Sequence, residues 1–361
     1  MRHIEYFCHQ NRSGYAQAAQ DYIYALRGSN RYDIKVSLLH PSPDQVSVSP
    51  QRYAEFMQMM GKIASDNAVQ IVHAIPERQL HIRKRTKTIG FGTFETFDPP
   101  SHWIEILNQN NAIIVPSAFN EKVFRHAGVK KPIFHIPHCV DPSLYNTAVP
   151  SQKEHSEFTF MFFGTWKRRK GWPQLLEAWF KEFDTSDNVR LLLKTDRITL
   201  AQRGIEETRR SVGLGKDFAP ISFESRVLNE TAIPLLIKKA DCLICPTLGE
   251  GFGLPGLQAM ALGVPVVTTN YSGCQDYAMA ETATMIEPSG FIILSEMDNI
   301  PQFVDHKWAH VTTESIAKAM RYVVENTAAV VKKAESAATF VAKEFGYEKT
   351  VKRFDAMLES L

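Results

Sequence analysis

The chain has 361 residues, of which 44% are hydrophobic and 22% are charged, and its formal net charge at pH 7 is +2. This length allows two domains with separate buried cores, and the composition excludes wholesale disorder. The near-zero net charge gives no global signature of nucleic-acid binding. No apolar run approaches the roughly 20 residues of a membrane span, and the first residues lack the apolar stretch of a secretion signal. We therefore expect a cytoplasmic protein.

The first part of the chain alternates short apolar runs with amphipathic segments, a pattern typical of alternating strands and helices. Strands are expected at residues 4–8, 33–39, 69–73, 87–91, 111–115 and 133–136, and helices at 15–26 and 52–64. A polar stretch with one proline and two serines, residues 146–157, predicts a linker after these elements.

The same alternation resumes after the linker. Strands are expected at residues 158–163, 189–194, 221–223, 242–245 and 265–268, and helices at 172–183, 201–212, 230–239, 255–262 and 345–361. Two successive α/β units predict parallel sheets with ligands at the carboxyl ends of the strands. Cys242 and Cys245 form a C-x-x-C pair, but they lie in a buried-strand pattern, which favours neither zinc nor redox chemistry.

A glycine-rich loop follows the strand at 242–245 and carries the most information. It places Gly249, Gly251 and Gly253 just before a helix with Pro255 near its first turn. Glycine lets backbone N–H groups approach an anion closely, and a helix N-terminus adds free donors and about half a positive charge. The segment therefore predicts a cradle for a diphosphate, the alternative being a glycine-rich turn without a ligand.

The segment that begins at Glu250 resembles the signature of glycosyltransferase family 4, whose members are retaining enzymes of GT-B architecture with nucleotide-sugar donors. It reads Glu-Gly-Phe-Gly-Leu-Pro, followed by Ala-Met-Ala, a glycine and Pro-Val at the family's spacing. The resemblance implies that Glu250 faces the donor sugar and is catalytic. It also implies that the donor is bound by Gly251, Phe252, Gly253, Leu254 and Gln258.

Gln258 departs from the family pattern, because it stands where a second Glu usually accepts hydrogen bonds from the ribose hydroxyls. Glutamine accepts through one oxygen only and carries no charge. This difference leaves three readings open: weaker ribose binding, adaptation to another donor, or loss of turnover.

The resemblance extends to the turn after the strand at 158–163. Gly164 and the basic residues Arg169 and Lys170 resemble the family's diphosphate-binding turn, which implies catalytic roles for both cations. Many members carry an Arg where this chain has Thr165, so Arg169 is expected to substitute for it. Lys194, at the end of the next strand, is implied as a donor-binding residue. The alternative for the turn is a solvated basic surface.

In the first unit, Ser13 and Gly14 resemble the family's N-terminal glycine loop, which approaches the donor phosphates. Glu95 falls where many members carry a His that touches the donor sugar, so it is expected to be a catalytic residue that binds sugar hydroxyls or orients the acceptor. His73 is a candidate sugar contact. The alternatives are a solvated loop carboxylate for Glu95 and a hydrogen-bonded structural histidine for His73.

Metal chemistry is not expected. The chain has no Asp-x-Asp motif and no His, Cys and carboxylate cluster with metal-ligand spacing. We therefore expect no cofactor, with Arg169, Lys170 and helix dipoles neutralising the diphosphate in place of a divalent cation. The resemblance implies front-face substitution, in which the leaving phosphate helps to deprotonate the acceptor.

The predicted fold is α/β: a GT-B architecture of two Rossmann-like doubly wound domains facing a central cleft. Residues 1–148 form the acceptor-side domain, residues 149–340 the nucleotide-sugar-binding domain, and residues 341–361 a C-terminal helix that can pack back on the first domain. The predicted activity is that of a hexosyl- or pentosyltransferase. It moves a sugar from a nucleotide-diphosphate-sugar to a hydroxyl of a glycan, a glycolipid or a small molecule.

Two alternatives stay open. Gln258 motivates a nucleotide-sugar-binding protein with impaired catalysis. A basic run that includes Arg83, Lys84 and Arg85 motivates a glycosyltransferase acting on hydroxylated bases of nucleic acid, or peripheral contact with an anionic membrane. Residues 1–150 carry a net charge of +4 and the remainder −2, which fits an anionic partner of the first domain. The sequence does not name the donor, the acceptor or the oligomeric state.

Overall fold

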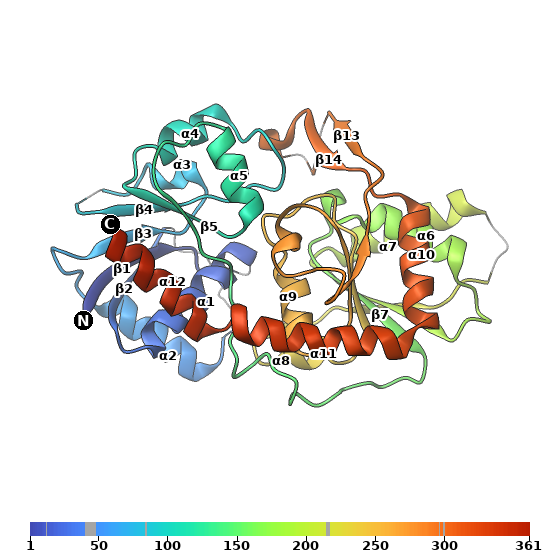
Figure 1. Ribbon diagram of the computed structural model, residues 1–361. Helices are drawn as coiled ribbons and strands as arrows, with labels where there is room; N and C mark the ends of the chain where they lie inside the picture. The colour runs from blue at the N-terminus through green and yellow to red at the C-terminus, as the bar shows by residue number, and fades with distance from the viewer. Residues whose placement is uncertain (12, 40–47, 84, 214–216, 296, 299) are drawn as a thin grey trace. The chain divides into compact units, whose positions relative to one another are not determined.

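The computed structural model describes residues 1–11, 13–39, 48–83, 85–213, 217–295, 297–298 and 300–361. The chain forms two compact units, each built on a six-stranded parallel sheet (Figure 1). Unit 1 consists of residues 1–144, 228–231 and 342–361, and unit 2 of residues 145–227 and 232–341.

The sheet of unit 1 has the strand order β2-β1-β3-β4-β5-β6. Its strands are β1 (Arg2–Cys8), β2 (Tyr32–Leu38), β3 (Val69–Val72), β4 (Thr88–Phe91), β5 (Ala112–Val115) and β6 (Ile133–His135). Its helices are α1 (Gly14–Gly28), α2 (Pro50–Gly61), α3 (Pro76–Gln79), α4 (Ser101–Leu107), α5 (Ala118–His126) and α12 (Tyr347–Ser360). All six strands expected from the sequence are confirmed, whereas α3, α4 and α5 were not expected.

The core of unit 1 follows from the alternation of buried residues along β1, where Ile4, Tyr6 and Cys8 are fully buried. The C-terminal helix α12 belongs to this core. The ring of Phe354 packs edge-on against Tyr22 of α1, with 5.4 Å between the ring centroids. The last helix therefore covers the first one.

The sheet of unit 2 has the strand order β12-β11-β10-β7-β8-β9. Its strands are β7 (Phe158–Phe163), β8 (Val189–Lys194), β9 (Ile221–Glu224), β10 (Cys242–Cys245), β11 (Val266–Thr269) and β12 (Thr284–Ile286). Its helices are α6 (Trp172–Glu182), α7 (Ile198–Val212), α8 (Ala232–Ile237), α9 (Leu254–Ala261), α10 (Thr313–Glu325) and α11 (Thr327–Glu344). The last three residues of α11, 342–344, belong to unit 1. Three short 3-10 helices are η1 (Arg168–Lys170), η2 (Ser272–Asp276) and η3 (Pro301–Phe303). Cys242 and Cys245 lie in β10, as the buried-strand interpretation predicted, and their thiols form no disulfide.

The helix expected at residues 230–239 is shorter than predicted and begins at Ala232. The residues before it, 228–231, belong to unit 1. There Glu230 accepts hydrogen bonds from Nη1 of Arg52 and from the backbone N–H of Ser49, both at 3.1 Å. A tertiary ion pair therefore overrides the helical pattern at this end.

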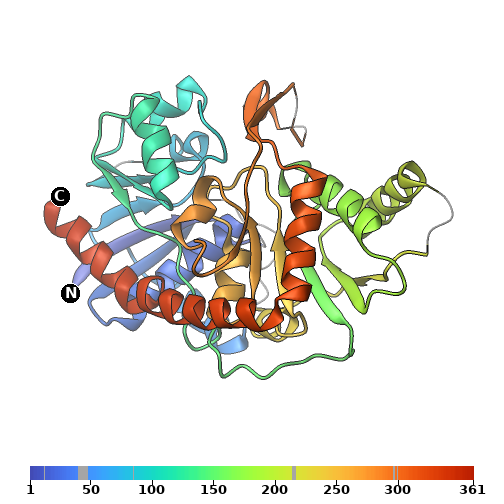
Figure 2. The same cartoon turned by 45° about the vertical axis from the view of Figure 1, so that its right-hand side comes forward.

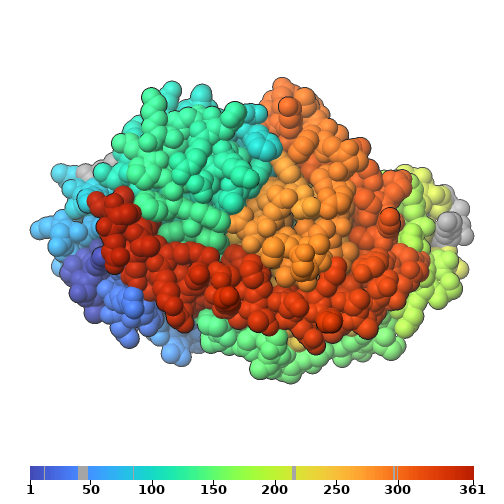
Figure 3. All heavy atoms as spheres, viewed as in Figure 1, coloured from blue at the N-terminus to red at the C-terminus, as the bar shows by residue number. Residues whose placement is uncertain are grey.

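A separate antiparallel ribbon, β13 (Phe291–Leu294) and β14 (His306–Ala309), projects from unit 2 (Figures 1 and 2). Trp308 is buried, whereas Phe291 and Ile293 are exposed. The sequence analysis did not expect this ribbon or the 18-residue helix α11. The outer side of α11 is open to solvent (Figure 3). Within the described part of the chain, no helix is long and apolar enough to cross a membrane.

Candidate functional site

Glu250 lies in the loop between β10 and α9, and its backbone is fixed on both sides. Its N–H donates to Oγ of Ser272 at 2.9 Å, and its carbonyl oxygen accepts the N–H of Gly273 at 3.0 Å. Only 12% of the side chain is exposed. The turn at Ser272 therefore fixes the backbone from which the carboxylate of Glu250 projects.

Two cations from η1, directly after β7, meet this carboxylate. The ammonium group of Lys170 forms an ion pair with Oε1 of Glu250, and Nη1 of Arg169 lies 3.4 Å from Oε2. The backbone of Arg169 is held as well. The N–H of Leu248 and the hydroxyl of Thr247 both donate to its carbonyl oxygen, at 2.8 and 3.0 Å. The structure thus brings together the three residues of unit 2 that the sequence analysis named as catalytic.

The charge state of Glu250 follows from these neighbours. Burial alone would raise the pKa of the carboxyl, but the charges of Lys170 and Arg169 and the hydrogen bond from Lys170 outweigh burial and lower the pKa below its ordinary value. Glu250 is therefore ionised at neutral pH.

Glycine is required at two backbone positions beside the cluster. Gly171 has φ of +74°, and a Cβ there would lie 1.8 Å from the carbonyl oxygen of Pro246. Gly253 has φ of +96° and is the N-cap of α9, where it leaves the first N–H groups of the helix without an intrahelical acceptor. The hydroxyl of Tyr277 donates to the carbonyl oxygen of Gly253 at 2.8 Å and fixes this end of the loop.

Three further donor candidates lie in helix α9 or just before it. Phe252 and Leu254 are buried at its start, and Gln258 is buried one turn further along. A small cavity of about 20 Å³ lies here. Its lining includes Lys170, Glu250, Gly253, Pro255, Gly256, Cys274 and Tyr277.

Gly164 and Lys194 lie at the carboxyl ends of the neighbouring strands β7 and β8. Gly164 donates its N–H to the carbonyl oxygen of Lys194 at 3.0 Å, and its Cα faces the alkyl chain of Lys170. The ammonium group of Lys194 donates to the carbonyl oxygens of Glu224 and Arg226, at 3.5 and 2.5 Å. Lys194 is therefore engaged with the backbone that follows β9.

In unit 1, Ser13 and Gly14 lie at the N-terminus of α1, beyond the carboxyl end of β1. Ser13 is the N-cap, and its Oγ accepts the N–H of Ala16 at 3.2 Å. A Cβ at Gly14 would meet no atom within 4 Å, so packing does not require glycine there. The helix expected at 15–26 is thus confirmed, whereas the approach of Ser13 and Gly14 to the donor phosphates stays a prediction.

His73 and Glu95 also follow carboxyl ends of strands in this sheet. His73 is 1% exposed, its Nδ1 is hydrogen bonded to the hydroxyl of Tyr6 at 2.9 Å, and its ring stacks on Phe91 at 3.8 Å. Burial, followed by the charges of His138 and His9, lowers the pKa of His73 well below its ordinary value. This environment is that of a neutral structural histidine. Glu95 is half-buried, close enough to Tyr15 for its charge to act on that hydroxyl.

The basic run lies elsewhere on unit 1. Arg83 and Arg85 are exposed and bond through their backbone to Gln70 near the start of β3, just before β4 begins. Lys84 lies outside the described residues. Because the strands are parallel, this is the amino edge of the sheet, opposite to the edge where His73 and Glu95 lie. The structure thus separates these arginines from the other candidates of unit 1.

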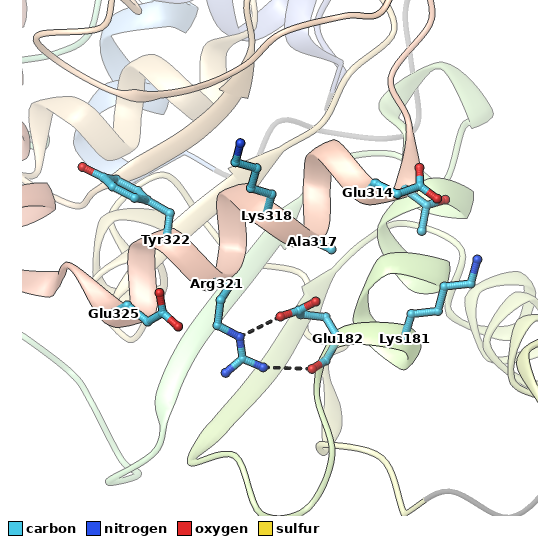
Figure 4. A pocket seen from close by; sticks show the side chains of 9 residues that line it. Lys181, Glu182, Glu314, Ala317, Lys318, Arg321, Tyr322 and Glu325 are labelled. Carbon is cyan, nitrogen blue, oxygen red and sulfur yellow. Dashed lines mark hydrogen bonds and ion pairs between the residues drawn. The ribbon is translucent and has the colours of Figure 1, made fainter.

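A hollow of about 490 Å³ lies between α6 and α10, away from Glu250 (Figure 4). Arg321 crosses it to bond the carboxylate and the carbonyl oxygen of Glu182, at 2.7 and 2.9 Å. The other charged side chains of this hollow line its walls, and none of the predicted site residues is among them. No group of three or more His, Cys, Asp or Glu side chains among the described residues has an arrangement that could hold a metal ion.

Comparison with known proteins shows a similarity between the part of the chain that holds this site and a known family of domains. Residues 157–305, which contain Arg169, Lys170 and Glu250, match the family model described as glycosyl transferases group 1. Residues 157–305, less than half of the chain, are therefore similar to a glycosyltransferase group 1 domain. The prediction of a glycosyltransferase is confirmed at this level, whereas the narrower assignment to family 4 stays a prediction.

One relative shares part of the sequence, and two solved structures share the fold. Over 95 residues the chain is 30% identical to O-antigen chain mannosyltransferase B of Escherichia coli, a match that spans 26% of this chain and 24% of the mannosyltransferase. The structure is similar to Anabaena Alr3699/HepE, solved in complex with UDP and glucose, with a TM-score of 0.69, 13% identity and full coverage of both chains. It is also similar to the sucrose-phosphate synthase of Thermosynechococcus elongatus, with a TM-score of 0.70, 14% identity and coverage of 100% and 99%. The predicted GT-B fold is confirmed.

Sequence reasoning missed two side chains of the site. Thr247 ties the glycine loop to Arg169, and Asp298 approaches the same arginine from the segment between β13 and β14. A threonine after a buried strand was a weak local signal for the first. Asp298 had no sequence signal, since it lies in a segment without periodicity.

Proposed function

We propose that the chain is a retaining glycosyltransferase that transfers a sugar from a nucleoside-diphosphate-sugar to a hydroxyl acceptor without a metal ion. The observation that carries this proposal is the cluster of Arg169, Lys170 and Glu250 beside the N-terminus of α9. Two cations and free helix N–H groups suit a diphosphate, and a fixed carboxylate suits the hydroxyls of a sugar.

The transfer reaction requires few other groups from the protein. The bond between the sugar C1 and the diphosphate oxygen breaks, the acceptor oxygen bonds to C1 on the same face, and the acceptor proton passes to the leaving diphosphate. Arg169 and Lys170 stabilise the charge that develops on the leaving group. The lowered pKa of Glu250 makes this carboxylate a weak base, which supports a proton path through the diphosphate.

For the acceptor we propose a glycan or a glycolipid. HepE was solved with UDP and glucose, and the mannosyltransferase from Escherichia coli is named for an O-antigen chain, a glycan. The nucleic-acid alternative depended on the basic run, and Arg83 and Arg85 lie at the amino edge of their sheet, away from His73 and Glu95. Their position therefore gives the nucleic-acid reading no support.

The first experiment identifies the donor. Purified protein is incubated with UDP-, GDP-, dTDP- and ADP-sugars, and release of the nucleoside diphosphate is measured with and without a panel of glycan acceptors. We expect one nucleotide class to be hydrolysed slowly and transferred faster with an acceptor, and NMR of the product to show the anomeric configuration of the donor. Lys170→Ala should strongly reduce this signal, and Lys318→Ala on the exposed face of α10 is the matched control.

The same experiment tests the alternative of a binding protein with impaired catalysis, which Gln258 motivates. Tight nucleotide-sugar binding without hydrolysis or transfer on any acceptor would favour that alternative. Inversion of the anomeric centre would contradict the retaining mechanism while leaving the donor assignment intact.

A further inference from the structure

Asp298 approaches the donor site from the segment between β13 and β14, outside every motif that the sequence analysis used. Its Oδ1 accepts the backbone N–H of Arg168 at 2.5 Å, and its Oδ2 lies 3.9 Å from Nε of Arg169. The side chain is 4% exposed, and its Oδ2 accepts no hydrogen bond from any residue that the structure describes. This buried oxygen therefore acts on Arg169 through its charge.

Arg169 lies between two carboxylates as a result. Its Nη1 is 3.4 Å from Glu250 on one side, and its Nε is 3.9 Å from Asp298 on the other. Lys170 adds a second cation on Glu250, so the four side chains are formally neutral together. A diphosphate that binds here is attracted by the two cations and repelled by both carboxylates.

The ribbon that carries Asp298 is tied to the backbone of the same cluster. The N–H of Ala309 in β14 donates to the carbonyl oxygen of Leu248 at 3.0 Å, and the N–H of Leu248 donates to the carbonyl oxygen of Arg169 at 2.8 Å. These bonds fix β14 relative to Arg169. The ribbon is thus anchored beside the cluster, and the hydrogen bond from the Arg168 N–H holds the Asp298 carboxylate next to the guanidinium.

We infer that Asp298 is a positioning residue of the donor site: it shares Arg169 with Glu250 and sets how tightly the site retains a diphosphate. This inference rests on the proposed function. The carboxylate restricts the orientation of the guanidinium, and its negative charge weakens the hold on the diphosphate product, which favours product release. Glu250, in contrast, is proposed to contact the sugar itself.

The variant Asp298→Asn separates this role from a purely structural one. Asparagine keeps an oxygen that accepts the Arg168 N–H, but it removes the charge. We expect the Kd for inorganic pyrophosphate, and for the nucleoside diphosphate that the wild type binds, to fall about tenfold when the repelling charge is removed. Asp298→Ser provides a second neutral acceptor, Asp298→Glu should restore the wild-type Kd, and Asp305→Asn, exposed in the same segment, is the control.

Steady-state kinetics give an independent readout. In the Asn variant we expect the KM for the donor and kcat to fall together, because the product diphosphate leaves more slowly. A role confined to the Arg168 hydrogen bond would leave Kd, KM and kcat of the Asn variant unchanged. If the wild type binds a diphosphate and the Asn and Ser variants bind it with the same Kd, the inference about Asp298 is overturned while the proposed function stands. Failure of the wild type to bind pyrophosphate or any nucleoside diphosphate would overturn the proposed function with it.

Discussion

The hydroxyl oxygen of Ser272 accepts the backbone N–H of Glu250 at 2.9 Å, across a gap of 22 residues in the sequence. Ser272 has φ of +60°, a left-handed conformation that is uncommon for residues other than glycine. The next N–H, that of Gly273, donates to the carbonyl oxygen of Glu250. One turn with a strained residue thus clamps the backbone of the proposed catalytic carboxylate, as is common where a functional site requires fixed geometry.

Replacing Ser272 with Ala should loosen this clamp. The N–H of Glu250 would stay buried without its acceptor, which costs about 1–3 kcal/mol in the free energy of unfolding. Donor hydrolysis should fall as well, because the carboxylate is no longer fixed. Urea unfolding and a nucleoside-diphosphate release assay measure the two effects, with Ser211→Ala on the exposed side of α7 as the control. Unchanged stability would show that the hydrogen bond contributes nothing to the fold.

Glu250→Gln should lower turnover much more than stability. Glutamine has nearly the same shape and can still accept from Lys170, but it loses the charge. Losing one charged interaction with the transition state costs roughly 10²–10³ in rate. The comparison uses transfer rates and thermal melting, with the exposed Glu281→Gln as the control. Near-wild-type transfer by the Glu250 variant would remove Glu250 from the catalytic group.

Chelation should leave transfer unchanged, because Arg169 and Lys170 are proposed to neutralise the diphosphate. The experiment compares initial rates with and without EDTA, followed by addition of magnesium or manganese. Lys170→Ala should raise the KM for the donor and lower kcat in both conditions, since one of the two cations is gone. Loss of activity in EDTA that either metal restores would show that the site depends on a divalent cation.

Most of the strands and the core of the site were predictable from the sequence because their signals are local. Short apolar runs defined every strand of the two sheets except the edge strand β12, and the glycine loop with Glu250 defined the start of α9. The encounter of Arg169 and Lys170 with Glu250 was predictable through the family resemblance. Parallel strands β7 and β10 are neighbours, so the residues that follow them meet at one edge.

The remaining features depend on contacts between distant segments. Asp298 meets Arg168 across 130 residues, and the ribbon that carries it has no alternation that a periodicity argument could detect. The basic run was expected near the acceptor, but only the pairing of β3 with β4 decides which edge of the sheet it occupies. Lys194 was expected at the donor, but its ammonium group bonds to the carbonyl oxygens of Glu224 and Arg226.

Gln258→Glu tests whether the buried residue on α9 serves the ribose of the donor. A carboxylate accepts from two hydroxyls and forms stronger, charge-assisted hydrogen bonds. We therefore expect the variant to keep nucleotide binding and to bind about as tightly as the wild type or more tightly. Isothermal calorimetry with the nucleoside diphosphate of the active donor gives the Kd. Complete loss of binding, with folding intact by circular dichroism, would assign Gln258 another role.

Unit 1 should lose stability in acid because it buries two neutral histidines. Burial lowers the pKa of His138 to about 3 and that of His73 well below its ordinary value, whereas both titrate near 6.5 in an unfolded chain. Their contribution is therefore complete above pH 6.5. It is lost as the pH falls, because the unfolded chain binds protons that the folded unit does not. Asp21 acts in the opposite direction, because burial raises its pKa to about 7. As the pH falls, the carboxyl of Asp21 therefore takes up a proton in the folded unit at a higher pH than in the unfolded chain.

Substitutions separate the acid-induced loss of stability caused by the histidines from the gain caused by Asp21. As the pH falls from 6.5 to 5, each buried histidine should reduce the free energy of unfolding by about 1.4 kcal/mol per pH unit, whereas Asp21 should raise this free energy by a similar amount. His138→Gln should therefore remove about 2 kcal/mol of the acid-induced loss over this range, and Asp21→Asn should add about as much. Urea unfolding is carried out at pH 7 and pH 5 and monitored by hydrogen exchange of peptides from α1. This readout gives the free energy of unfolding of unit 1 alone. His126→Gln, exposed at the end of α5, is the control. A wild-type pH slope in the His138 variant would mean that this histidine takes up its proton in the folded unit as readily as in the unfolded chain.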